Sequence, residues 1–218
     1  MNTPFEPPRA MLPEEMAALP QARYEGEVVI AQTPDEALRA LERLGGEAVL
    51  GFDTETRPTF KRGVNYLPSL VQLAGAELVV LVRPGAFAAW AELTAVLGDE
   101  AVVKAGVAVR DDINALGKLG PVTPRRFEDV GEWAKKFGWP VTGLRNLAAG
   151  LLGLRVSKKA RLTNWEASCL SPAQVCYAAT DAWVSRELYL AMEAIRPLLK
   201  KKEAAARARA ARKAAKEE

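Results

Sequence analysis

The first half of the chain is patterned mainly as strands. The apolar run from Ala48 to Phe52 predicts a buried strand, and Glu27–Ala31 predicts another. Two further apolar runs, Ser69–Ala74 and Glu77–Val82, are joined by a turn around Gly75, which is the pattern of a hairpin. Because a hairpin beside the Ala48–Phe52 strand is antiparallel, we expect a mixed β-sheet.

Helical patterns occur in the first half as well and dominate the second half of the chain. Thr33-Pro34-Asp35-Glu36 is a capping box with proline at the first helical position, and it starts a helix that runs to Leu44. Ser171-Pro172-Ala173-Gln174 repeats this signal and starts a final helix whose apolar pattern continues to about Leu199. This order of elements predicts an α/β fold, a mixed sheet flanked by α-helices. The other predicted elements are helices over residues 86–97, 111–119, 132–137 and 144–152 and short strands over residues 101–104 and 127–130.

These patterns divide the chain into three parts. Residues 1–23 are rich in proline and weakly patterned, so we expect an N-terminal arm. Residues 24–199 carry the periodic elements and form the predicted domain. Residues 200–218 are rich in Ala, Lys and Arg without an apolar stripe, which predicts a solvated helix or a disordered tail.

Charge is distributed unevenly between this tail and the rest of the chain. The segment from Arg196 to Glu218 holds nine Lys and Arg against three Glu, an excess of six positive charges. Since the whole chain carries +3, residues 1–195 carry a net charge of −3. The basic tail either adds salt-sensitive contacts to phosphates or serves only solubility, and the sequence leaves both open.

The chain contains no histidine, which excludes Ser-His-Asp and Cys-His catalysis and imidazole metal sites. Any hydrolytic chemistry must therefore use carboxylates, Tyr, Lys or a metal ion. The two cysteines, Cys169 and Cys176, have the spacing of neither a disulfide framework nor a zinc site. The chain has no run of 18 uncharged apolar residues and no signal-peptide segment, which predicts a cytoplasmic protein without a membrane partner.

Two carboxylates follow the Ala48–Phe52 strand. Asp53 and Glu55 are two residues apart, so along a strand they emerge on the same side. Like charges held side by side repel, and a divalent ion such as Mg²⁺ or Mn²⁺ between them would relieve the repulsion. For an isolated pair the alternative, two solvated residues on an exposed strand tip, is favoured.

Further acidic residues stand where they can join this pair. Asp112 is expected on the first turn of a helix, where it either serves the same site or only compensates the helix dipole. Tyr177 and Asp181 are four residues apart and lie on one helix face. The alternative for them is a core aromatic and a surface acid.

In this order the three segments resemble the three motifs of the DEDD 3′–5′ exonucleases, in the tyrosine subclass. The Werner-type exonuclease domain and the catalytic domain of ribonuclease D are most similar. Asp53 and Glu55 match the first motif, Asp112 closes the second, and Tyr177 and Asp181 match the third. The resemblance spans roughly residues 28–195, and it includes the apolar-Gln-Leu strand after the first motif and the Asn-Trp segment before the third. In the second motif Ala108 replaces a frequent second glycine, which we take as conservative.

This resemblance implies a ribonuclease H-like fold and a metal-dependent 3′–5′ exonuclease. The enzyme would release nucleoside 5′-monophosphates from nucleic acid, DNA or RNA, with a free 3′ end. Two divalent ions, Mg²⁺ or Mn²⁺, about 3.5–4 Å apart would activate water and stabilise the leaving oxygen. Asp53, Glu55 and Asp181 would hold one ion, and Asp53 and Asp112 the other. Tyr177 would orient or help deprotonate the attacking water.

Candidate substrate contacts lie near the first motif. We predict Arg57, Lys61, Tyr66 and Gln72 as substrate-binding residues, because single strands are held by backbone charge and aromatic stacking. A solvated face is the alternative for the charged ones, and it applies equally to the basic residues at 158, 159 and 161. Trp165 is either a core residue or a stacking platform.

Two other function classes remain as alternatives. One is a catalytically silent nucleic-acid-binding module on the same fold. It would retain a cluster of acids that only destabilises the core. The other is a haloacid dehalogenase-type phosphatase, since Asp-Thr-Glu-Thr loosely resembles the Asp-x-Asp-x-Thr of that family. It would need an Asp in place of Glu55, and it leaves Asp112 and Tyr177 without a role.

Overall fold

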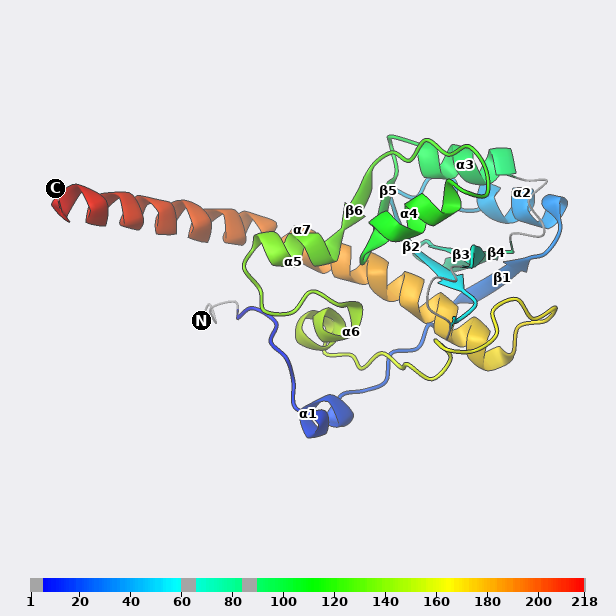
Figure 1. Ribbon diagram of the computed structural model, residues 1–218, viewed down its shortest axis with the longest axis horizontal. Helices are drawn as coiled ribbons and strands as arrows, with labels where there is room; N and C mark the ends of the chain where they lie inside the picture. The colour runs from blue at the N-terminus through cyan, green and yellow to red at the C-terminus, as the bar shows by residue number, and fades with distance from the viewer. Residues whose placement is uncertain (1–5, 60–65, 84–89, 218) are drawn as a thin grey trace.

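A mixed sheet of six strands forms the centre of the computed structural model, which describes residues 6–59, 66–83 and 90–217 and side chains as far as residue 199. The strands are β1 Glu27–Ala31, β2 Val49–Thr56, β3 Pro68–Ala74, β4 Leu78–Val82, β5 Val103–Gly106 and β6 Phe127–Asp129. Their order in the sheet is β1-β4-β3-β2-β5-β6 (Figure 1). β3 runs antiparallel to β4 and β2, whereas the remaining neighbours are parallel. The expected hairpin and mixed sheet are therefore confirmed.

Helices cover both faces of the sheet. They are α1 Pro13–Ala18, α2 Pro34–Glu42, α3 Trp90–Gly98, α4 Val109–Leu116, α5 Val130–Lys136, α6 Leu144–Leu147, the π-helix η2 Ala148–Leu152, and α7 Pro172–Glu217. Helices α2, α3 and α4 pack on one face, and α7 crosses the other face together with α5 and α6 (Figure 1). Among the described residues, none of these helices is both long and apolar enough to span a bilayer.

Local capping signals fixed the helix starts as expected. The Thr33 hydroxyl accepts from the Glu36 backbone N–H at 3.3 Å, and the Ser171 hydroxyl accepts from that of Gln174 at 3.3 Å. Helix α7 continues to Glu217, well past the end of its apolar stripe, as the high helix propensity of the Ala/Lys/Arg tail allows. In Figure 1 this extension projects away from the sheet as one helix.

Several elements differ from the sequence prediction. β5, α4 and α5 are shifted by one to three residues from the predicted ranges 101–104, 111–119 and 132–137. β2 runs on to Thr56, four residues past the predicted end, because β3 pairs with it along this whole stretch. The single helix expected over residues 144–152 is divided into α6 and η2, and it ends as predicted at Gly153, whose φ is 65°. The predicted start of α3 falls within residues 84–89, outside the described part of the chain.

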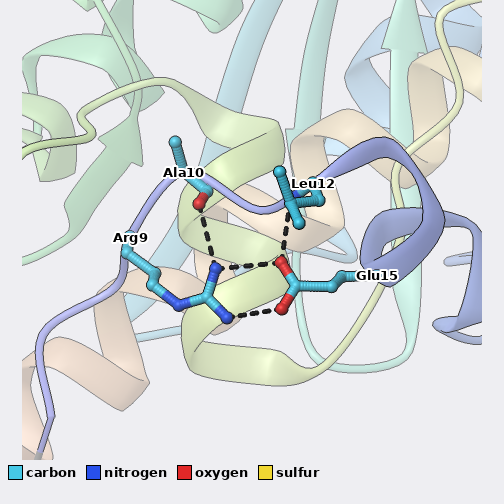
Figure 2. Close-up of polar contacts among 4 residues, drawn as sticks. All are labelled: Arg9, Ala10, Leu12 and Glu15. Atoms are coloured by element: carbon cyan, nitrogen blue, oxygen red, sulfur yellow. Dashed lines mark hydrogen bonds and ion pairs between the residues drawn. The ribbon is translucent and has the colours of Figure 1, made fainter.

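The N-terminal segment contains a helix that its weak pattern did not predict. Glu15 organises the start of α1: its carboxylate accepts from the Leu12 backbone N–H at 2.8 Å and pairs with the Arg9 guanidinium (Figure 2). The hydrogen bond from Arg9, followed by that from Leu12, lowers the pKa of Glu15 to about 2. A local ion pair and a capping bond therefore hold this turn.

The same segment is packed into the domain. Ala22 N–H donates to the Arg155 carbonyl at 2.9 Å, and Arg155 N–H donates to the Pro20 carbonyl at 2.8 Å. Tyr24 N–H donates to the Thr180 hydroxyl on α7 at 3.1 Å, and the side chains of Ala22 and Tyr24 are buried. Residues 20–24 thus belong to the core, and the division of the chain at residues 23 and 199 stays a proposal about its domains.

Gly150 gives a direct test of how firmly this segment is held. A Cβ at Gly150 would lie 2.5 Å from the Cβ of Pro8, which is itself buried. Overpacking of this kind costs about 1–3 kcal/mol, and alanine recovers up to about 1 kcal/mol of helix propensity. We therefore expect Gly150→Ala to lower the Tm by about 2–4 °C in thermal unfolding.

The contact with Pro8 is what this substitution tests. The penalty should disappear when residues 1–8 are removed, because the side chain that the new methyl group meets is then absent. Gly143→Ala is the matched control, since a Cβ there meets no atom within 4 Å, and its Tm should stay close to that of the wild type. An equal loss from Gly150→Ala in the full and the shortened chain would contradict the packing of the segment against η2.

Candidate active site

Strand β2 and helix α7 bring three carboxylates together. Side chains alternate between the two faces of β2, so Asp53 and Glu55 both lie on the face that packs against α7. Asp181 lies on α7. One oxygen from each of the three lies within 4.8 Å of the other two. Glu55 and Asp181 are buried and Asp53 is half-buried. The structure thus joins residues that are more than 120 positions apart in the sequence.

This close approach depends on small residues. A Cβ on Gly51 would clash with the carbonyl oxygen of Ala182 on α7 and lie 3.0 Å from the Arg186 backbone nitrogen. Ala178 and Ala182 are fully buried against the sheet. Glycine at position 51 therefore allows α7 to lie directly on β2, which places Asp181 beside the two strand carboxylates.

The three carboxylates are protonated more readily than free ones. Burial, followed by the charges of Asp53 and Asp181, raises the pKa of Glu55 to about 10. Burial raises the pKa of Asp181 to about 7, against the opposing effect of a hydrogen bond from Tyr177. The pKa of Asp53 is also raised, first by burial and then by the charge of Asp181. A group of like charges in this setting needs protons or a cation.

One oxygen of the cluster has no partner. Oδ1 of Asp181 is buried without a hydrogen bond from any described residue. Buried carboxylate oxygens normally accept hydrogen bonds or coordinate a metal ion. Asp181 belongs to the one group among the described residues in which three carboxylates gather closely enough to share an ion.

Asp112 lies at the edge of this cluster rather than within it. It projects from α4 and accepts a hydrogen bond from the hydroxyl of Thr54, the strand residue between Asp53 and Glu55. Burial raises its pKa to about 6, although the Thr54 hydrogen bond opposes the shift. Its charge in turn raises the pKa of Asp53. No sequence motif indicated a role for Thr54. Its position between Asp53 and Glu55 on β2 puts its side chain on the opposite face of the strand, toward α4.

The backbone conformation of the turn before α4 explains why the second motif often has glycine at the position of Ala108. Ala108 adopts φ 61° and ψ 31°, the left-handed conformation, immediately before the helix. A residue with a Cβ is strained there by about 1 kcal/mol relative to glycine. The substitution is thus less conservative than the sequence alone implied.

Tyr177 stands one helical turn before Asp181 on α7. Its hydroxyl forms the hydrogen bond to Asp181, and its pKa is raised, mainly by burial and then by the charges of Asp181 and Glu55. Its ring packs against Trp165, with ring centroids 6.0 Å apart. Because Trp165 has no exposed surface, it is a core residue that supports Tyr177 and not a stacking platform.

The four predicted substrate-binding residues lie in different environments. Arg57 is exposed, pairs with Glu166 at 3.0 Å, and its guanidinium lies 5.0 Å from the centre of the Tyr66 ring. Lys61 lies outside the described residues. Gln72 is completely buried in β3. A side chain without exposed surface has nothing to offer a nucleic acid, so the prediction of Gln72 as a substrate-binding residue is not supported.

Two hollows flank the carboxylates. One, of about 380 Å³, is lined by Glu55, Arg57, Tyr66 and Arg161 among others. The second, of about 330 Å³, is lined by Arg145, Lys158, Arg161, Tyr177 and Asp181 among others. Arg161 is exposed and lines both hollows. Cationic side chains therefore border the acidic cluster where these hollows adjoin it.

Comparison with known proteins gives a consistent assignment. Residues 28–195 match the model of a family described as 3′-5′ exonuclease. The chain is 36% identical over 181 residues to ribonuclease D of Gluconacetobacter diazotrophicus, covering 80% of this chain and 44% of that protein. It is 37% identical over 174 residues to ribonuclease D of Acidiphilium cryptum, covering 77% of this chain and 43% of that protein. The chain thus spans less than half the length of these curated relatives.

A solved structure shows the same fold. The crystal structure of Escherichia coli RNase D, described as an exoribonuclease involved in structured RNA processing, superposes with a TM-score of 0.68 at 23% identity. The match covers 83% of this chain and 49% of that one. The expected ribonuclease H-like sheet flanked by helices is therefore confirmed, and the phosphatase alternative is not supported.

Proposed function

Since the chain belongs to the DEDD family of 3′–5′ exonucleases, we propose that it removes nucleotides from the 3′ end of RNA by metal-dependent phosphodiester hydrolysis. The products are nucleoside 5′-monophosphates. The observation that carries the proposal is the group of three carboxylate oxygens within 4.8 Å, from Asp53, Glu55 and Asp181. RNA is the favoured polymer because the relatives at 36–37% identity are named ribonuclease D.

The donor set suits hard divalent cations. It consists of carboxylate oxygens without histidine or thiolate, which favours Mg²⁺ or Mn²⁺ over zinc or copper. The unpartnered Oδ1 of Asp181 supplies a ligand atom that the protein itself leaves unsatisfied. In this proposal Asp53, Glu55 and Asp181 hold one ion, and Asp53 and Asp112 hold the second, Asp112 directly or through water. When bound, the ions activate the attacking water and stabilise charge on the leaving oxygen.

Tyr177 supports the chemistry as a neutral hydroxyl. Burial and the neighbouring carboxylates raise its pKa, so it stays protonated at neutral pH. In that state it both donates to Asp181 and can accept from a water molecule, which orients the nucleophile. This is the role we assign to it, and we propose that the chain belongs to the tyrosine subclass.

The proposal is tested with labelled single strands. RNA and DNA of equal sequence, labelled at the 3′ or the 5′ end, are incubated with Mg²⁺ or Mn²⁺, and products are resolved by length. We expect stepwise shortening from the 3′ end, faster on RNA, with release of 5′-monophosphates and no reaction in chelator. Tight binding without metal-dependent cleavage would favour the silent nucleic-acid-binding module instead.

The carboxylates also predict how metal and pH affect stability. The folded-state pKa values of Glu55, about 10, and Asp181, about 7, exceed the values near 4 of unfolded chains. A carboxyl group whose pKa is raised by folding stabilises the folded state fully when the pH is below its pKa in the unfolded chain. This stabilisation is lost as the pH rises through its pKa in the folded protein. We therefore expect the Tm of the metal-free protein to fall from pH 6 to pH 8.

Metal should reverse this loss, because its ligands must be deprotonated. The rise in Tm on adding Mg²⁺ or Mn²⁺ should be larger at pH 8 than at pH 6, and differential scanning fluorimetry against a chelator control measures it. In Asp181→Asn this difference between the two pH values should shrink. An equal rise in Tm at both pH values would contradict the clustering of ionisable ligands.

Arg161 is the best described candidate for a contact to the substrate backbone, because it is exposed and lines both hollows. We expect Arg161→Ala to weaken binding of a single-stranded RNA about tenfold at low salt, measured by fluorescence anisotropy in chelator. The slope of log Kd against log salt should fall by about 0.7, the value for one phosphate contact on a single strand. Arg39→Ala, exposed on α2 across the sheet, is the control. Unchanged salt dependence in Arg161→Ala would remove this residue from the substrate path.

We propose three further features of substrate binding and location. Arg57 and Tyr66, in contact with each other beside Glu55, bind the substrate, as does Lys61. The basic C-terminal tail adds salt-sensitive contacts to nucleic acid. The enzyme acts in the cytoplasm.

A further inference from the structure

Gln72 is a polar residue in an apolar part of the core. It lies in the middle of β3 with no exposed surface, and neither its Oε1 nor its Nε2 has a hydrogen-bond partner among the described residues. Leaving a buried polar group unpaired costs about 1–3 kcal/mol, so unpaired amides are rare in cores. A leucine or methionine would satisfy the packing without this cost. The amide therefore requires another explanation.

The neighbours of Gln72 on the sheet limit which groups can form a hydrogen bond with its side-chain amide. β3 pairs Gln72 with Asp53 on β2 and with Leu81 on β4. Directly opposite side chains share one face, with Cβ atoms about 4.5–5.5 Å apart. Leu70 and Ala74, two residues away on β3, share this face and are apolar. Of these four neighbours, only Asp53 can form a hydrogen bond.

The layer above Gln72 is also apolar. Leu70, Ala74 and Leu81 belong to one buried cluster together with small residues of α7, namely Ala178, Ala179 and Ala182. The polar groups described on this face are the carboxylate cluster and the hydroxyls of Tyr24 and Tyr177, and of these Asp53 stands directly opposite Gln72. Asp53 Oδ1 already accepts from the Thr54 backbone N–H at 2.9 Å, which helps to orient the carboxylate.

We infer that Gln72 is a positioning residue, whose side-chain N–H donates to the Asp53 carboxylate when the cluster holds its metal ions. The inference rests on the proposed function. Carboxylates that bind metals are commonly held by hydrogen bonds from outside the ligand set, and losing such a bond typically costs 10- to 100-fold in metal affinity or activity. The amide is unpaired in the metal-free protein, so its N–H is available for this bond.

Substitution by methionine separates a positioning role from a structural one. Gln72→Met keeps the length of the side chain and removes the unpaired amide, so the metal-free variant should melt at a higher temperature than the wild type. At the same time its affinity for Mn²⁺, measured by calorimetry, should fall 10- to 100-fold, and kcat should fall similarly with little change in KM for RNA. Leu70→Met, on the same strand and face, is the matched control and should leave Mn²⁺ affinity within about twofold.

A second measurement needs no variant enzyme to be active. In a ¹⁵N spectrum the Gln72 side-chain amide, assigned by its absence in Gln72→Met, should shift when the wild type is saturated with Mg²⁺. An unmoved amide signal, or Gln72→Met with wild-type Mn²⁺ affinity, would overturn the positioning role while leaving the exonuclease proposal intact. Absence of Mn²⁺ binding in the wild type itself would instead overturn the proposed function.

Discussion

Replacing Asp53 by asparagine should reduce exonuclease activity by at least about 10³-fold. Asp53 is the carboxylate that both proposed ions share, so the change weakens both at once. Metal ions contribute several kcal/mol to stabilising the transition state of phosphodiester cleavage, and each 1.36 kcal/mol is a factor of ten in rate. The measurement is the initial rate of release of 5′-monophosphates from 3′-labelled RNA at saturating Mg²⁺.

The same substitution should make the metal-free protein more stable, which excludes unfolding as the cause of the lost activity. Asp53 is flanked by Glu55, Asp181 and the charge of Asp112, so removing its charge relieves repulsion. The Tm in chelator should rise, and the additional rise on adding Mn²⁺ should vanish. Asp111→Asn, an exposed acid beside Asp112 on α4, is the matched control and should retain activity. More than a tenth of wild-type activity in Asp53→Asn would contradict the assignment of the site.

Local signals predicted much of the architecture. Capping boxes at Thr33 and Ser171 set the helix starts because the bonds that form them lie within four residues. The spacing of Asp53 and Glu55 placed both on one side of β2 because side chains alternate along any strand. The three motifs of the family then indicated that Asp181 belongs with them, and this joining of distant residues rested on the resemblance alone.

What the sequence could not show depends on which strands are neighbours. Gln72 was predicted to face substrate, yet β3 lies between β4 and β2 and beneath α7, so its side chain is buried. Thr54 gains its role only because α4 brings Asp112 to it. The N-terminal segment lacks periodicity, and its place is set by tertiary contacts such as that of Pro8 with Gly150. None of these contacts leaves a local pattern.

Replacing Tyr177 by phenylalanine should lower kcat by about 10²-fold at saturating Mn²⁺, and the loss of its hydrogen bond to Asp181 should also weaken Mn²⁺ binding, by up to about 100-fold. The hydroxyl is lost but the ring still packs against the buried Trp165, so the position of α7 is kept. A positioned proton-transfer or orienting group typically contributes 10²–10⁴-fold to the rate. We assign Tyr177 the orienting role and therefore expect an effect at the lower end of this range. Single-turnover cleavage of 3′-labelled RNA, combined with calorimetric titration of Mn²⁺, separates chemistry from metal binding. Tyr189→Phe is the control, because Tyr189 lies on the same helix and packs against Trp133.

The pH profile decides whether Tyr177 orients water or removes its proton. Burial and the surrounding carboxylates raise its pKa, so the hydroxyl stays protonated over the working range and an orienting role adds no ionisation of its own. The profiles of wild type and Tyr177→Phe should then have the same shape between pH 6 and pH 9 and differ by a constant factor. A general base would instead give the wild type a rise with pH that the variant lacks. Equal rates for the two proteins would show that neither role applies, and water would have to be held by the carboxylates alone.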